Sequence, residues 1–399
     1  MPIFDQGYQH WKGRLSGHVW RWLAITRHGI RVQLKGRYVR LLMTLAWMPT
    51  LALVAALAVW GLLEQGTLGL ESFMKTILPT GITADPHAYR QSMWTLAYSY
   101  FFKTEILFIM LLVTLTGPGL ISRDLRFNAL PLYFSRPLTR LDYFLGKLGV
   151  IGALVAAVAV LPAAAAYVLG VCFSLDLGVV RDTWRLLPAS ILYGLVIVAS
   201  VGTLILALSS LSRRSLYVGI AWIGLWLIGS AVAFVLGMIQ EQSFRYDIMR
   251  DEMARANAEL PPQSQRGQHG QFPRNLDWQR MNERVQKALT ETARTNWRPL
   301  FSYTANLERL GEGLLKTDAA WVQIGRATAA PQAELRAMFG SSRPGAGMHF
   351  DSEPANERFL ADQYVPQYPW TWSAAVLAGL LGISLWTLSV RVKSLDRLR

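Results

Sequence analysis

Two charged side chains, Lys103 and Glu105, lie within an otherwise apolar stretch of the chain. If this stretch crosses a bilayer, each charge costs at least about 2.5–3.5 kcal/mol, so we treat both residues as candidate functional charges. Residues two apart on a helix point in roughly opposite directions, so the two do not pair with each other. Two interpretations remain open. Either both residues lie in the outer turns of the helix and Lys103 extends to the membrane surface, or Glu105 faces the translocation path.

Motifs for other chemistry are absent. The only Gly-Lys pair, Gly146-Lys147, lacks the upstream glycine of a phosphate-binding loop, so the backbone cradle for ATP is missing. The sequence has no His-Glu-x-x-His zinc motif and no Gly-x-Ser-x-Gly nucleophile elbow. Its six histidines are scattered, and its single cysteine, Cys172, excludes an intramolecular disulfide and a cysteine-based metal site. We therefore expect no catalytic residue, cofactor or metal in this chain.

Composition indicates an all-α polytopic membrane protein. Of 399 residues, 52% are hydrophobic and only 17% are charged, whereas soluble proteins carry about 25% charged residues. The net charge of +14 is concentrated at the ends of apolar blocks, as expected for membrane topology rather than for nucleic-acid binding. Six blocks are long enough to cross a bilayer, which takes about 20 residues. They are Leu41–Leu63 (bent at Pro49), Met93–Gly119, Leu148–Cys172, Leu187–Leu211, Leu216–Ile239 and Trp370–Val390.

The segment before the first block, residues 1–40, is predicted to form a basic amphipathic helix in the membrane interface. Apolar residues recur there at helical spacing, from Trp11 through Trp22 to Ile30, and basic residues occupy the other positions. No cleavable signal peptide is expected, because the first apolar block begins about forty residues into the chain.

The distribution of lysine and arginine predicts the orientation in the cytoplasmic membrane. If the N-terminus is cytoplasmic, the segments 1–40, 122–147, 212–215 and 391–399 place 19 lysines and arginines inside. The two short loops on the other side, 64–92 and 173–186, carry 4. Positively charged loops stay in the cytoplasm, so we expect both termini there.

One long segment, residues 240–369, then lies outside the cell. It carries 16 basic and 16 acidic residues, and long segments translocate largely regardless of charge. Apolar spacing predicts one helix around Trp278–Thr292 and another around Tyr303–Leu314, joined by linkers at 261–270 and 340–347. We expect a mostly helical extracytoplasmic domain.

The loop after the second block has the most distinctive sequence. Arg123, Asp124 and Arg126 form a charged, helical knob just inside the membrane, and Pro137 stops the helix before it. Thr139 and Asp142 then form a capping box that starts the third span. The stretch Ser135-Arg136-Pro137-Leu138-Thr139-Arg140 is followed by Gly146-Lys147.

This order of residues resembles the permease subunits of the type-2 exporter branch of ATP-binding-cassette (ABC) transporters. Those subunits have an acidic–basic pair, a Leu-Leu-Ser-Arg-Pro-x-Ser/Thr-Arg stretch and a Gly-Lys pair at the same place, although glutamate is commoner than Asp124. The resemblance implies that residues 120–147, with Arg123, Asp124, Arg126, Arg136, Pro137, Thr139 and Arg140, form a loop that couples the permease to a separate cytoplasmic ATPase. It also implies a second permease subunit, identical or different, and ATP-driven export. One departure is the long segment 240–369, because members commonly have a short re-entrant helical pair there.

Two other classes of function remain as alternatives. The chain would be a membrane scaffold or sensor if the segment 240–369 recognises a ligand or an extracytoplasmic protein. It would be a membrane-embedded enzyme if external residues such as His269, Asp351 or Glu353 carry an unfamiliar site. An ATPase subunit that co-purifies with the chain would separate the transporter from both.

Overall fold

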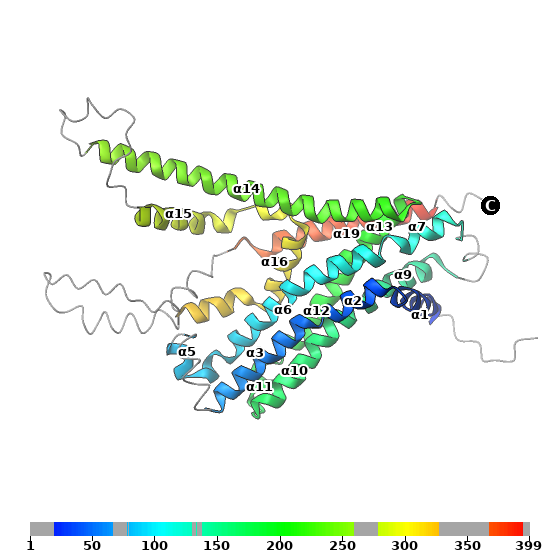
Figure 1. Ribbon diagram of the computed structural model, residues 1–399, viewed down its shortest axis with the longest axis horizontal. Helices are drawn as coiled ribbons and strands as arrows, with labels where there is room; N and C mark the ends of the chain where they lie inside the picture. The colour runs from blue at the N-terminus through cyan, green and yellow to red at the C-terminus, as the bar shows by residue number, and fades with distance from the viewer. Residues whose placement is uncertain are drawn as a thin grey trace, which may run out of the picture.

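The computed structural model describes residues 20–66, 78, 80–129, 133, 138–258, 278–326 and 367–393, and these residues form helices without any strand (Figure 1). The first half of the chain contains the helices α1 (Arg21–Leu34), α2 (Arg37–Leu45), α3 (Met48–Glu64), α5 (Thr80–Ala84), α6 (Pro86–Thr116), α7 (Gly119–Arg126), α9 (Arg140–Val155), η2 (Ala156–Val160) and α10 (Leu161–Ser174). The second half contains α11 (Gly178–Thr183), α12 (Leu186–Ile197), η3 (Val198–Gly202), α13 (Thr203–Leu211), α14 (Ser215–Ala258), α15 (Trp278–Thr292), η4 (Ala293–Thr295), η5 (Arg298–Phe301), α16 (Tyr303–Leu315) and α19 (Trp370–Lys393).

Six of the helical segments in the described ranges are long and apolar enough to cross a membrane, which confirms the all-α polytopic prediction. They are Arg37–Glu64, Pro86–Arg126, Arg140–Ser174, Gly178–Leu211, Ser215–Arg255 and Trp370–Arg391. Each contains one of the six predicted blocks and extends beyond it, because helical hydrogen bonding continues into the polar flanking residues. The first span is interrupted between α2 and α3 by a turn at Ala46-Trp47, and Pro49 lies in the first turn of α3, where a proline costs no hydrogen bond.

The third and fourth spans each contain a five-residue π-helix, η2 and η3, in the interior of the span. Each π-helix packs against the neighbouring span, and η2 also contacts α6. A π-bulge is a local change of helical register that is often found at functional sites.

The N-terminal helix α1 packs along α9, at the start of the third span. A Cβ atom at Gly149 would overlap the side chain of Thr26, so only glycine allows the two helices to approach this closely. The Thr26 hydroxyl donates a hydrogen bond of 3.0 Å to the carbonyl oxygen of Gly146. Helix α1 is therefore fixed to the bundle, whereas residues 1–19 of the predicted interfacial helix lie outside the described part of the chain.

The bundle has two distinct ends, which are named here by their short helices. Helices α1 and α7 lie at one end, the α7 end, and helices α5 and α11 lie at the other, the α11 end (Figure 1). Between them the buried core is formed mainly by α6, with contributions from α3, α9, α10, α12 and α13, and it includes Trp94, Tyr98, Phe102 and Tyr193.

Helix α16, from the long segment between the fifth and sixth spans, packs against α6, α12, α14 and α19. A Cβ at Gly311 would overlap the Tyr193 ring, and the Tyr193 hydroxyl donates to the Leu307 carbonyl at 2.8 Å. Both helices predicted in this segment are present, as α15 and α16. The predicted linkers at 261–270 and 340–347 lie outside the described residues.

Candidate functional site

Helix α7 is held against the end of α13 by one buried serine. Helix α6 ends at Gly117-Pro118, and the Ser209 hydroxyl accepts hydrogen bonds from the backbone N–H groups of Ile121 and Ser122 at 3.1 and 3.0 Å. The same hydroxyl donates to the Pro118 carbonyl at 2.8 Å. The first N–H groups of a helix have no hydrogen-bond acceptor within the helix. Ser209, from the fourth span, provides the acceptor that a capping residue next to the helix usually provides.

Asp124 connects α7 to the third span. Its carboxylate lies 2.7 Å from the Lys147 ammonium and accepts a hydrogen bond of 2.7 Å from the Tyr143 hydroxyl. The Lys147 ammonium also lies over the Tyr143 and Tyr133 rings, at 5.4 and 5.9 Å from their centroids. The side chains of Asp124 and Lys147 are only 16% and 11% exposed, so this ion pair is partly shielded from solvent. Asp124 therefore links α7 directly to α9.

The other face of α7 is exposed. Arg123, Arg126 and Phe127 are open to solvent, and the Arg126 guanidinium lies over the Phe127 ring at 5.5 Å. Asn128 has a positive φ of 51°, which ends the helix directly after this face. The result is a basic and aromatic knob that is fixed to the bundle on one side and free to contact another molecule on the other.

The start of the third span forms as expected from its sequence. The Thr139 hydroxyl accepts from the Asp142 N–H at 3.2 Å, and the Asp142 carboxylate accepts from the Thr139 N–H at 3.0 Å. This reciprocal pair is the predicted capping box, and Arg140 is the first residue of α9. Arg136 and Pro137 lie outside the described residues.

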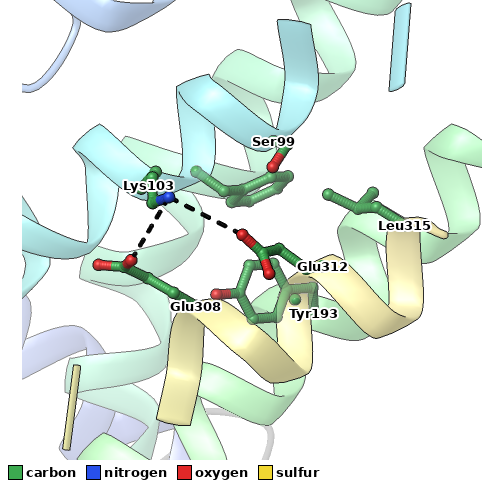
Figure 2. A pocket seen from close by; sticks show the side chains of 8 residues that line it. Ser99, Lys103, Tyr193, Glu308, Glu312 and Leu315 are labelled. Atoms are coloured by element: carbon green, nitrogen blue, oxygen red, sulfur yellow. Dashed lines mark ion pairs between the residues drawn. The ribbon is translucent and has the colours of Figure 1, made fainter. Parts of the chain in front are cut away.

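Lys103 lies in the middle of α6 and faces α16 (Figure 2). Its ammonium is 3.9 Å from the Glu308 carboxylate and 3.8 Å from the Glu312 carboxylate, so the charge is compensated by the segment between the fifth and sixth spans. Lys103 lines a small pocket with Tyr193 and both glutamates, and it also lines an adjacent cavity of about 300 Å³. Burial raises the pKa of Glu308 to about 7, although Lys103 opposes the shift; the neighbouring Glu312 adds to it.

Glu105 points away from this pocket into the core. It is fully buried, and neither carboxylate oxygen has a hydrogen-bond partner among the described residues. The structure thus separates the two charges of the second span: Lys103 has acidic partners and a cavity, whereas Glu105 has neither in the described part of the chain.

A second charged cluster, which the sequence did not reveal, lies at the α11 end. The Arg90 guanidinium contacts Glu64 at 2.7 and 2.9 Å, Asp176 at 2.9 Å and Asp182 at 3.1 Å. Arg90 and Glu64 are 3% and 2% exposed, and Glu64 also accepts from Trp60 and Ser174 at 2.8 Å. A hydrogen bond from the Gly178 N–H, together with Arg90, lowers the pKa of Asp176. This cluster joins the ends of the first four spans. The only signal for it in the sequence is that each of its residues lies near the end of a span.

No described residues form a group of three or more His, Cys, Asp and Glu side chains placed to hold a metal ion. The six candidate spans define a polytopic membrane protein, with an anchored knob after the second span and a charged cavity within the bundle. The model of the ABC-2 family of transporter proteins matches residues 36–319. The chain belongs to this family, and it is an ABC transporter permease. No curated protein and no solved structure matches the chain.

Proposed function

We propose that this chain is the membrane-spanning subunit of an exporter that uses ATP hydrolysed by a separate cytoplasmic ATPase subunit. The observation that carries the proposal is the two-sided construction of α7. Ser209 and Lys147 hold its inner face on the fourth and third spans, and Arg123, Arg126 and Phe127 leave a basic and aromatic outer face.

The outer face suits a partner with an acidic, partly apolar groove. Arginine is well suited to such a contact because its guanidinium binds carboxylates through two hydrogen bonds and stacks on aromatic rings. By resemblance to the family, the partner is the ATPase subunit, and the rest of the loop 120–147, with Arg136, Pro137, Thr139 and Arg140, completes the docking surface. Asp124 has a different role here: it transmits movement to α9 and does not contact the partner.

The proposal includes an orientation of the chain in the membrane. Both termini and the α7 end lie in the cytoplasm, where the excess of lysine and arginine is found, and residues 240–369 lie outside. Helix α16 then enters the bundle from the outer side, in the place of the short re-entrant helix of the family. A second permease subunit, identical or different, completes the translocation path.

The proposal is tested by purifying the tagged full chain in mild detergent with its ATPase candidate co-expressed. We expect about one soluble ATPase subunit per chain, and we expect the R123A/R126A variant to lose it. The matched control is R27A/R31A, which removes two exposed arginines from α1 at the same end of the bundle. Retention of the ATPase by R123A/R126A would refute docking on α7. Recovery of the chain without any ATPase, or with an extracytoplasmic protein alone, would favour the scaffold or sensor.

A further inference from the structure

A cavity of about 450 Å³ lies at the α11 end, between the start of α6, the helices α11 and α12, and the end of α16 with the helical residues 317–326. Its volume falls within the roughly 300–1,000 Å³ range typical of sites for small molecules. This cavity is separate from the α7 knob and from the cavity beside Lys103. Leu315 lines both this cavity and the small pocket shown in Figure 2.

One part of the wall is apolar. Leu186 and Ala189 of α12 face the cavity from one side, and Leu314, Leu315 and Ala319 face it from the other. The inner end of this apolar wall is Leu315, beyond which Lys103, Glu308 and Glu312 line the next pocket (Figure 2). An apolar group of limited length therefore fits here and ends before the charged pocket.

The polar groups of the wall divide into two kinds. Most are already paired: Asp182 binds Arg90 at 3.1 Å, and the Ser92 hydroxyl donates to Gln323 at 2.6 Å. Arg185 and Lys316 are exposed and form no ion pair with any carboxylate in the described ranges. The cavity thus presents two positively charged side chains that have no ion-pair partner in the described ranges, beside an apolar wall and together with Asp182, which shares Arg90 with Glu64 and Asp176.

The surroundings place this cavity at the depth of lipid headgroups. Trp184, which is 56% exposed, contacts the Arg185 guanidinium through its ring at 5.7 Å, and tryptophan is enriched at membrane–water interfaces. Leu175 and Leu177 in the preceding turn are 81% and 83% exposed, which suits contact with lipid rather than with water.

We propose that this cavity binds one membrane phospholipid with an anionic headgroup. The phosphate lies at Arg185 and Lys316, and one acyl chain packs on Leu186, Ala189 and Leu314. A phosphate anion accepts charge-assisted hydrogen bonds from both side chains, and the apolar wall removes part of the chain from water. The lipid then joins α12 to α16, two helices from distant parts of the sequence.

The test uses the purified full chain in phosphatidylcholine nanodiscs that contain a small fraction of a photoactivatable lipid. Binding requires no ATPase, so the result is independent of the proposed function. We expect photoactivatable phosphatidylglycerol to label peptides around 186–189 and 314–320 about tenfold more than photoactivatable phosphatidylcholine does. A tenfold difference in binding corresponds to about one charge-assisted hydrogen bond. The R185Q/K316Q variant should lose about tenfold of this labelling. The matched control R181Q/R326Q removes two exposed arginines from α11 and from the helical residues 317–326, and it should label like the wild type.

A second variant, A319W, fills the cavity from an exposed position and should reduce labelling without changing the elution volume in size-exclusion chromatography. An excess of inorganic phosphate should not displace the lipid, because the acyl chain contributes to binding. Equal labelling by the two lipids, or full labelling of R185Q/K316Q, would overturn the proposal. Displacement by inorganic phosphate would also overturn it, because the site would then recognise a free anion and not a lipid.

Discussion

Replacing Arg90 by methionine should strongly destabilise the bundle. Arg90 holds Glu64 through two short contacts of 2.7 and 2.9 Å, and both side chains are almost fully buried. In the R90M variant the Glu64 carboxylate stays buried and retains only the Trp60 and Ser174 donors. Removing one partner of a buried ion pair costs about 3–5 kcal/mol.

The other two acidic partners contribute less. Asp176 and Asp182 are 49% and 43% exposed, so water solvates them after Arg90 is lost, and each exposed pair contributes about 0–1 kcal/mol. The expected loss in the free energy of unfolding is therefore about 3–5 kcal/mol and comes mainly from Glu64. The double variant E64Q/R90M removes the buried charge as well, and we expect it to recover more than half of this loss.

The assay is denaturant unfolding in mild detergent, followed by tryptophan fluorescence. The control is R181M, which removes an exposed arginine from the same end of the molecule and should change the stability by less than about 0.5 kcal/mol. The reasoning is refuted if R90M is as stable as R181M. It is also refuted if E64Q/R90M is no more stable than R90M, because the cost would then not arise from an unpaired buried carboxylate.

Three further outcomes are expected. The S209A variant should lose about 1–3 kcal/mol of stability because the N–H groups of Ile121 and Ser122 lose their acceptor. The control S210A should lose less, because the Ser210 hydroxyl bonds only within its own helix. Equal losses of the two variants in thermal unfolding would contradict the role of Ser209. The D124N variant should reduce permease-stimulated ATPase activity, because Lys147 loses its carboxylate partner. The exchanged pair D124K/K147D should restore part of this activity. No recovery would indicate a role for Asp124 other than pairing with Lys147. Burial raises the pKa of Glu308 to about 7, so the folded state binds more protons than the unfolded state between pH 4 and 7. The contribution of Glu308 to stability should therefore be nearly full at pH 4 and be lost as the pH rises through about 7. E308Q should remove this part of the pH dependence in thermal unfolding, and an unchanged pH profile would show that Glu308 titrates normally.

The spans and the capping box were predictable because they depend on local information. An apolar block of about 20 residues must form a helix in a bilayer, since no water is present to hydrogen-bond its backbone. The box at Thr139 and Asp142 requires only a spacing of three residues. The family was recognisable from the loop around Arg123 and Gly146-Lys147 for the same reason, since its residues are close in sequence.

The partners of the charged residues were not predictable. Lys103 meets Glu308 and Glu312, which lie some 200 residues later in the chain, and no periodicity connects them. Arg90 likewise draws its three acidic partners from three separate span ends. The short apolar pattern of α16 predicted a helix, but it did not reveal that this helix packs within the bundle, because amphipathic spacing shows which face is buried and not what covers it.

Helix α14 continues without interruption for 44 residues, which corresponds to a rod of about 66 Å, roughly twice the thickness of the hydrocarbon core. It contacts α7 and α13 near one end and α15 near the other (Figure 1). A rigid rod of this length acts as a lever: a tilt of about 10° at the α7 end would displace the far end by about 11 Å. Small rearrangements around Ser209 and Asp124 would therefore become large displacements of α15, so a distance label on α15 would be a sensitive reporter of events at the opposite end.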